Sequence, residues 1–308
     1  MEHKYENEWG IVLCGGGAKG AYQIGVWKAL KEYGIFEQIS GISGVSIGAI
    51  NEILMAGADY ETAERVWKEI NFLTVFDTEP ELIDMVEGTF SRNEMIDIMR
   101  ENIDYDKVAN SSYSLYVNIT RTGTNMEDQG RIPVYDSLNH KTASQMEKII
   151  LASSALPIVY EAVLIDGYYY RDGGLTDNMP IKPLYEQGYR KIIVVGLSHT
   201  AAINTDLYPD CEIVLIRPSK SLGNTFSGTL SFNKRDIEMR MELGYRDARR
   251  VLHTYFEKKE ISEAGLQALA EVDYEDIERT ARQNAVLNEV NSHMDQLNAI
   301  MGKYDIEK

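Results

Sequence analysis

The sequence is poor in cysteine. Its 308 residues include two, Cys14 and Cys211, and each lies in or beside an apolar run. This pattern predicts two small buried thiols rather than a disulfide framework or a metal cluster, so we expect no metal site. Reduced cysteines are typical of a cytoplasmic protein, which is the localisation that the sequence favours.

Long hydrophobic runs are also missing. Met1 to Glu8 is polar and mixed in charge, without the basic start and apolar stretch of a signal peptide. No apolar run approaches the roughly 20 residues that span a bilayer as a helix. Any contact with a membrane or a micelle is therefore expected to be peripheral.

Basic residues are scarce relative to acidic ones. The chain has 31 Lys and Arg against 48 Asp and Glu, a formal net charge of −17, and most of the excess lies before Leu222. Such a chain is a poor partner for nucleic acid and for anionic membrane surfaces. Binding of a lipid monomer or a neutral interface stays open, and so does formation of a homo-oligomer.

Short apolar segments alternate with helical patterns along the first two thirds of the chain. Strands are predicted at 10–14, 39–45, 113–120, 132–136, 159–165, 168–171, 191–197 and 211–217, and helices at 60–71, 81–87, 93–103, 142–151 and 182–187. Continuous apolar strands such as 191–197 suit the centre of a parallel sheet. The alternation predicts an α/β layered fold with a mostly parallel sheet.

The pattern changes after about residue 219, where helices dominate at 234–256 and about 274–301. We expect a main domain over residues 1–219, with its motifs between about 10 and 197. Residues 220–308 are predicted to form an α-helical C-terminal extension packed on that core.

The segment Gly44-Val45-Ser46-Ile47-Gly48 fits the pattern G-x-S-x-G. A nucleophilic serine of this kind projects from a sharp strand-to-helix turn, and small neighbours let strand and helix approach each other. The predicted strand before Ser46 and the helical spacing after it supply that context. A plain glycine-flanked turn is the simpler alternative.

Three consecutive glycines begin a second loop, Gly15 to Gly20, directly after the first predicted strand. The spacing fits G-x-G-x-x-G, but the acidic residue of a dinucleotide site is not convincing, since Glu37 precedes the second strand. The loop also lacks the Gly-Lys-Ser/Thr ending of a P-loop. Exposed N–H groups of such a loop can converge on an oxyanion.

The third segment is Asp172-Gly173-Gly174, which follows a tyrosine-rich strand. By itself it is equally consistent with an Asx turn. Its value comes from its place after the other two motifs.

The three motifs, in this order, resemble the patatin-like phospholipases. The flanking residues, including Ala152 to Pro157 and Asn178-Met179-Pro180, are similar to that family too, and the resemblance covers about residues 10–197. It implies a three-layer α/β/α patatin-like fold and a lipid acyl hydrolase of phospholipase A or lysophospholipase type. The substrate would be a lipid or fatty-acyl ester, and no cofactor is needed.

The resemblance also implies a role for each motif. Ser46 would be the nucleophile and Asp172 its base, in a Ser–Asp dyad. The oxyanion loop would comprise Gly15, Gly16, Gly17, Lys19 and Gly20, the nucleophile elbow would include Gly44 and Gly48, and the dyad motif would include Gly173 and Gly174. Lys19 would either position the loop or be solvated.

Two other functions stay open. The order Ser46, Asp172, His199 matches the chain order of α/β-hydrolases, and His199 follows a predicted strand, so a catalytic triad is possible on sequence grounds. A catalytically silent lipid-binding or regulatory module is the other alternative, because a sequence does not reveal whether the oxyanion hole is formed.

Apolar residues between the nucleophile helix and the next strand form a further candidate feature. Met85, Met95 and Met99 could pack in the core or cap an acyl chain, since methionine fills irregular apolar space. The run 168–170 of three tyrosines is predicted to be half-buried, with a wall of the acyl pocket as its alternative role.

Overall fold

A computed structural model describes residues 5, 7–69, 93–157, 159–224, 228–229, 232–256, 270–283 and 286. Its centre is one mixed sheet of eight strands in the order β5-β6-β3-β2-β1-β7-β8, with β4 paired to β3. The strands are β1 (Trp9–Leu13), β2 (Ile39–Val45), β3 (Ser114–Gly123), β4 (Ile132–Ser137), β5 (Val163–Ile165), β6 (Tyr168–Asp172), β7 (Lys191–Val195) and β8 (Glu212–Ile216).

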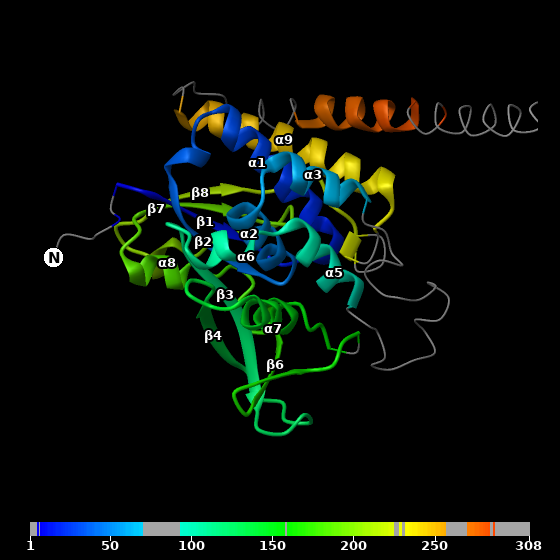
Figure 1. Ribbon diagram of the computed structural model, residues 1–308. Helices are drawn as coiled ribbons and strands as arrows, with labels where there is room; N and C mark the ends of the chain where they lie inside the picture. Colours follow the sequence, from blue (N-terminus) through cyan, green and yellow to red (C-terminus); the bar gives the residue numbers. More distant parts are fainter. Residues whose placement is uncertain are drawn as a thin grey trace, which may run out of the picture.

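The five strands β3, β2, β1, β7 and β8 run parallel to one another, whereas β4, β5 and β6 join in antiparallel pairs. Figure 1 shows β3, β4 and β6 reaching beyond the parallel part of the sheet. The sheet is therefore mixed and mostly parallel. This confirms the α/β fold expected from the alternation of strands and helices.

Alternation along β1 places its side chains on two different layers. Ile11 and Leu13 belong to the larger hydrophobic core, while Val12 belongs to a smaller one on the other face. All three side chains are fully buried. Because both faces are covered, β1 is apolar throughout, as a central parallel strand should be.

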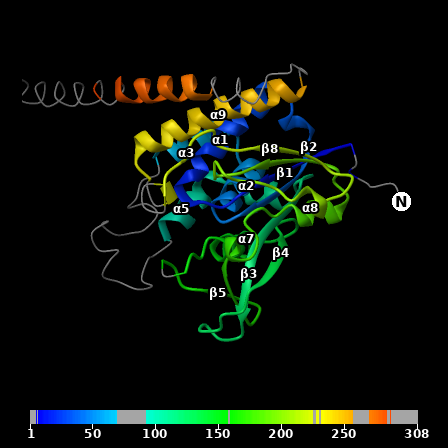
Figure 2. The same ribbon diagram turned by 180° about the vertical axis from the view of Figure 1, so that it is seen from behind.

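Helices cover both faces of the sheet (Figures 1 and 2). Residues of α1, α2, α3, α7 and α9 contribute to the larger core, and α8 packs in the smaller one. The α-helices are α1 (Ala21–Glu32), α2 (Ile47–Gly57), α3 (Tyr60–Glu69), α5 (Asn93–Asn102), α6 (Tyr105–Ala109), α7 (Ala143–Ser153), α8 (Lys182–Gln187) and α9 (Lys234–Phe256), and residues 270–283 are also helical.

The helix α9 lies against α1 at close range. A Cβ on Gly25 of α1 would lie 1.8 Å from the Met241 carbonyl oxygen, and one on Gly244 of α9 would lie 2.0 Å from the Tyr22 carbonyl oxygen. Glycine at both positions therefore lets the two backbones approach. The Tyr22 hydroxyl also donates to Asp247 at 3.1 Å, deep between the helices.

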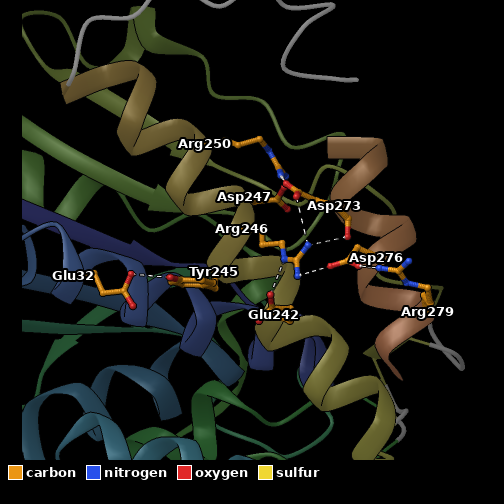
Figure 3. A network of polar contacts seen from close by, with 9 residues as sticks. All are labelled: Glu32, Glu242, Tyr245, Arg246, Asp247, Arg250, Asp273, Asp276 and Arg279. Atoms are coloured by element: carbon orange, nitrogen blue, oxygen red, sulfur yellow. Dashed lines mark hydrogen bonds and ion pairs between the residues drawn. The ribbon is translucent and has the colours of Figure 1, made fainter. Parts of the chain in front are cut away.

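A network of ion pairs joins α9 to the helical segment 270–283 (Figure 3). Arg246 contacts Asp273 and Asp276 at 3.4 and 3.1 Å, and Arg250 pairs with Asp273 and with Asp247. Burial raises the pKa of Asp247, and the Arg250 guanidinium counteracts part of that shift. The polar network thus ties the later helix to the one that covers α1.

Several sequence expectations differ from the structure in detail. The strand predicted at 159–165 is shorter, and helix α6 was not predicted. The helix predicted at 81–87 lies outside the described residues, as does much of 274–301. The division of the chain at residue 219 stays a prediction.

No helix within the described ranges is both long enough and apolar enough to cross a membrane.

Candidate active site

Ser46 stands at a strained turn between β2 and α2. Its φ of 55° and ψ of −124° lie where residues other than glycine are rare, which costs about 1–3 kcal/mol. A Cβ on Gly48 would lie 2.1 Å from the Leu13 carbonyl oxygen, and one on Gly44 would lie 2.6 Å from the Gly48 carbonyl oxygen. Only glycine lets α2 begin this close to β1 and β2.

Asp172 reaches Ser46 because β2 and β6 pair with the same edge of β3 and their C-terminal ends meet there. The last residue of β2, Val45, pairs with Asn118, and the last residue of β6, Asp172, pairs with the next residue, Ile119. The strands run in opposite directions, so their ends meet. Ser46 Oγ donates to Asp172 Oδ2 at 2.7 Å, and both side chains are buried.

The Asp172 carboxylate and backbone are held by the residues around them. Its Oδ1 accepts from the Gly174 N–H at 2.8 Å, and its own N–H donates to the Ala155 carbonyl at 2.9 Å. A Cβ on Gly173 would lie 2.1 Å from the Asn118 carbonyl oxygen. A Cβ on Gly174 would lie 3.0 Å from Asp172 Oδ1 and 3.0 Å from Asn178 Oδ1, so close packing favours glycine at both positions after the aspartate.

The glycine loop follows β1 and turns into a short 3₁₀ helix, Gly17–Gly20. The Gly15 N–H donates to Asn178 Oδ1 at 3.1 Å, and the Lys19 N–H donates to the Gly16 carbonyl at 3.3 Å. Among the described contacts, none uses the N–H groups of Gly16 and Gly17. Gly20 lies inside the 3₁₀ helix, where i→i+3 hydrogen bonds use the N–H groups. Of the predicted set, Gly16 and Gly17 therefore stay as candidate oxyanion donors.

Gly17 and Gly20 are packed too closely for any side chain. A Cβ on Gly17, whose φ is +57°, would lie 2.3 Å from the Thr229 carbonyl oxygen, and one on Gly20 would lie 2.5 Å from Ile47. The Lys19 side chain is half-buried, and its pKa is lowered by burial and by the Arg240 guanidinium. The glycine loop therefore packs against residues 228–229 at Gly17 and against α2 at Gly20.

A buried chain of side-chain hydrogen bonds supports the loop from below. Trp67 Nε1 donates to Asn51, whose Nδ2 donates to Gln23 at 2.7 Å and to the Gly20 carbonyl at 3.0 Å. Gln23 Nε2 in turn donates to the Cys14 carbonyl at 2.8 Å. The chain links α1, α2 and α3 to both ends of the glycine loop.

An apolar cavity of about 80 Å³ opens beside Ser46. It follows one face of α2 past Ile50 to Leu54, about 12 Å along the helix axis from Ser46. Two other helices and the segments between elements supply most of the remaining wall. These residues are Val66 and Trp67 of α3, Met95, Ile98 and Met99 of α5, and Ile103, Leu156, Tyr160 and Phe232 outside the helices.

The sequence left two groups of residues open as walls of an acyl pocket, the methionines before β3 and the three tyrosines of β6. Met95 and Met99 line the cavity, whereas Met85 lies outside the described residues. The run 168–170 is half-buried, as expected for a strand with one wet face, and does not line the cavity.

His199 lies beyond the end of β7 and is exposed. No described hydrogen bond joins it to Ser46 or Asp172. Within the described residues, no group of three or more His, Cys, Asp or Glu side chains is arranged to hold a metal ion. Both cysteines are free, and burial raises the pKa of the Cys14 thiol.

Comparison with known proteins identifies the family to which the chain belongs. The model of the patatin-like phospholipase family matches residues 11–185 of the chain. The chain belongs to this family. Patatin-like phospholipases are generally lipid acyl hydrolases.

Curated relatives share the same part of the chain. Lysophospholipase NTE1 of Cryptococcus neoformans is 31% identical over 198 residues, and neuropathy target esterase sws of Drosophila melanogaster is 28% identical over 198 residues. These matches cover 61% and 62% of this patatin-like chain, but 11% and 13% of the relatives. The chain thus spans only a small part of the length of these relatives.

Among solved structures, the crystal structure of VipD from Legionella pneumophila is similar. The match has a TM-score of 0.46 and 14% identity, and covers 94% of this chain and 77% of that one.

Sequence reasoning missed several side chains that shape this patatin-like site. Asn118, Asn51 and Gln23 are completely buried and hydrogen-bonded around the motifs. Asn118 stands inside the apolar strand Tyr116-Val117-Asn118-Ile119, where a polar residue is conspicuous. A polar residue at the centre of a predicted core strand was the signal that could have identified Asn118 as part of the site.

Glu52 is a buried carboxyl group beneath the elbow. A Cβ on Gly44 would lie 2.7 Å from Glu52 Oε2, and the side chain is fully buried. Burial raises the pKa of Glu52 well above its usual range, although backbone N–H groups of Tyr116 and Gly44 offset part of the shift. Because this pKa is raised on folding, the ionisation of Glu52 has no effect on stability below the unfolded pKa of about 4.3 and lowers stability as the pH rises above that value.

We therefore expect Glu52→Gln to stabilise the protein by an amount that grows between about pH 5 and pH 8, at up to about 1.4 kcal/mol per pH unit. Urea unfolding at both pH values measures this. The exposed residue Glu101 provides the control, since Glu101→Gln should change stability by less than about 0.5 kcal/mol at both. A Glu52→Gln effect that is equal at the two pH values would contradict the assignment of a neutral buried acid.

Proposed function

We propose that this chain is a serine-dependent lipid acyl hydrolase of the phospholipase A or lysophospholipase type, in which Ser46 is the nucleophile and Asp172 the base. The observation that carries the proposal is the 2.7 Å hydrogen bond from Ser46 Oγ to Asp172 Oδ2 at the mouth of an apolar cavity. A nucleophile bonded to a base beside a binding cavity is the arrangement required for covalent acyl transfer.

In the first step, Ser46 Oγ attacks the ester carbonyl carbon while its proton passes to Asp172 Oδ2. The tetrahedral intermediate collapses, the alcohol leaves with that proton, and the acyl group stays on Ser46. Water then gives a proton to Asp172 and attacks the acyl carbonyl carbon of the acyl-enzyme. The bond from Ser46 Oγ to the acyl carbon breaks, Asp172 returns the proton to Ser46 Oγ, and the fatty acid is released. The Gly174 N–H on Oδ1 keeps the other carboxylate oxygen facing Ser46 during both steps.

Negative charge develops on the carbonyl oxygen in each step. The N–H groups of Gly16 and Gly17 are the donors we assign to it, because these residues are the N-cap and first residue of the 3₁₀ helix, where N–H groups have no partner within the helix, and no described contact uses them. The N-terminus of α2 lies at Ser46 and favours negative charge there. One such donor supplies about 3 kcal/mol of transition-state stabilisation.

The cavity is suited to a fatty-acyl chain. Its lining is apolar apart from Ser46, Ser154, Tyr160 and Thr229, and it begins at the nucleophile. The name of the fungal relative, a lysophospholipase, agrees with a single-chain lipid ester as substrate. We infer that the acyl chain lies along α2 and that the alcohol or phosphate-bearing part stays toward solvent.

The first test is hydrolysis of a lysophosphatidylcholine and of a short-chain p-nitrophenyl ester by matched variants. Ser46→Ala and Asp172→Asn should each lower kcat by roughly 1,000-fold or more, because the nucleophile and its base act as a unit. His199→Ala is the control and should keep most of the activity, since His199 is exposed and contacts neither side chain.

Loss of activity in a folded His199→Ala variant would replace the dyad with a triad. A wild type that binds fatty acid but hydrolyses neither ester and resists fluorophosphonate labelling would instead support the silent lipid-binding module.

The end of the cavity away from Ser46 leads to a second prediction, on the length of the acyl chain that the enzyme prefers. Ile103 lines the cavity and lies 2.7 Å from where a Cβ on Gly57 would stand, at the C-terminal end of α2 and away from Ser46. Ile103→Ala should therefore lengthen the cavity and raise the ratio of kcat/KM for p-nitrophenyl dodecanoate over butyrate by roughly tenfold, because each buried methylene contributes about 0.8 kcal/mol.

Ile149→Ala serves as the control, because Ile149 is equally buried but does not line the cavity. It should lower stability without changing the ratio. An unchanged ratio in a folded Ile103→Ala variant would place the acyl chain elsewhere.

A further inference from the structure

Asn118 occupies the point on β3 where the two halves of the site meet. It pairs with Val45, the residue before Ser46, while the next residue of β3 pairs with Asp172. Its side chain is completely buried. No motif of the sequence includes it, and it contacts neither reacting atom in the proposed chemistry.

The side-chain amide of Asn118 holds the loop that follows Asp172. Its Nδ2 donates to the Gly173 carbonyl at 2.8 Å and to the Asp177 carbonyl at 2.7 Å. Both partners are carbonyl oxygens, which only accept, so the orientation of the amide is fixed by chemistry. The two bonds close the loop from Gly173 to Asp177 against β3.

The backbone of the same residue holds the elbow. Its carbonyl accepts from Ser153 Oγ at 2.7 Å, and Ser153 Oγ accepts from the Ser46 N–H at 2.8 Å. Ser153 is fully buried between them. One residue of β3 therefore contacts the Asp172 loop through its side chain and the Ser46 turn through its carbonyl.

We propose that Asn118 is the positioning residue that keeps Asp172 within hydrogen-bonding distance of Ser46. This inference rests on the proposed function, because it assigns Asn118 to the alignment of that dyad. Without the amide, the Asp177 carbonyl loses the donor described for it. The Gly173 carbonyl keeps the N–H groups of Thr176 and Asp177, but its link to β3 through Asn118 is lost, so the loop behind Asp172 is held less firmly against β3.

The other side-chain atom of Asn118 supports a functional reason for its presence. Its Oδ1 is buried and has no hydrogen-bond partner among the described residues. A buried acceptor without a donor lowers stability, so asparagine is not the choice that stability alone would make at this position. The two hydrogen bonds donated by Nδ2 therefore explain why asparagine is present at position 118.

The test compares Asn118→Ala and Asn118→Thr with Asn139→Ala. Asn139 is a matched control, because its side chain also closes a turn against β3, accepting from Leu115 N–H at 3.0 Å and donating to the Tyr113 carbonyl at 2.9 Å. Leu115 precedes Asn118 by three residues, about 10 Å along the strand. Asn139→Ala should therefore lower the melting temperature and leave kcat unchanged.

For Asn118→Ala we expect kcat on a short p-nitrophenyl ester to fall by roughly 100-fold with little change in KM, the effect of a misplaced base. Asn118→Thr keeps a hydroxyl donor in a residue that suits a strand, so its kcat should fall less than that of Asn118→Ala. Wild-type kcat in both variants, or an equal fall in kcat for Asn139→Ala, would overturn the proposal.

A crystal structure of Asn118→Thr, the milder variant, decides the question independently of catalysis. We expect the distance from Ser46 Oγ to Asp172 Oδ2 to be longer than in the wild type, in proportion to the smaller fall in kcat of this variant. An unchanged distance of 2.7 Å would overturn the positioning role. If the wild type hydrolyses no ester, the proposed function fails, and this distance still tests Asn118.

Discussion

The proposed chemistry depends on a single contact, the hydrogen bond between Ser46 and Asp172, and the surrounding structure holds this contact in place. These residues lie 126 positions apart and come from strands that run in opposite directions. They meet because β3 is longer than its neighbours, so that β2 pairs with its first half and β6 with its second half along the same edge. The change from parallel to antiparallel pairing within one strand is what brings the two motifs together.

Much of the surrounding packing keeps that contact in place at a cost in stability. Ser46 has a strained backbone conformation, Glu52 is a buried acid, and Asn118 carries a buried acceptor without a partner. Each of these lowers stability, and all three lie at or next to the elbow. Such violations of local preference are expected where a fold holds reactive groups. The packing of α1 against α9 and the network around Arg246 involve no such violation and stabilise the helices above the sheet.

The sequence predicted the layered α/β fold and located the motifs, because glycine loops and short apolar strands have local signatures. It placed a helix at Lys234–Phe256 from the helical pattern of its residues, and α9 has these bounds. The antiparallel pairing of β6 with β3 could not be predicted, because it depends on contacts between distant segments. For the same reason the roles of Asn118 and Asn51 were missed, since each side chain bonds residues from other elements. The roles of Gly15, Gly16, Gly17, Lys19 and Gly20 stay predictions. We assign the oxyanion to the N–H groups of Gly16 and Gly17, because those of Gly15 and Lys19 are hydrogen-bonded and Gly20 lies inside the 3₁₀ helix.

The central claim is that Ser46 forms a covalent acyl intermediate with help from Asp172. Mass spectrometry of the protein quenched during turnover of a p-nitrophenyl ester, followed by peptide mapping, tests it most directly. The account predicts one acyl group per chain on the peptide that contains Ser46, formed much more slowly in Asp172→Asn. An adduct on another residue, or turnover without any acyl-enzyme, would contradict it.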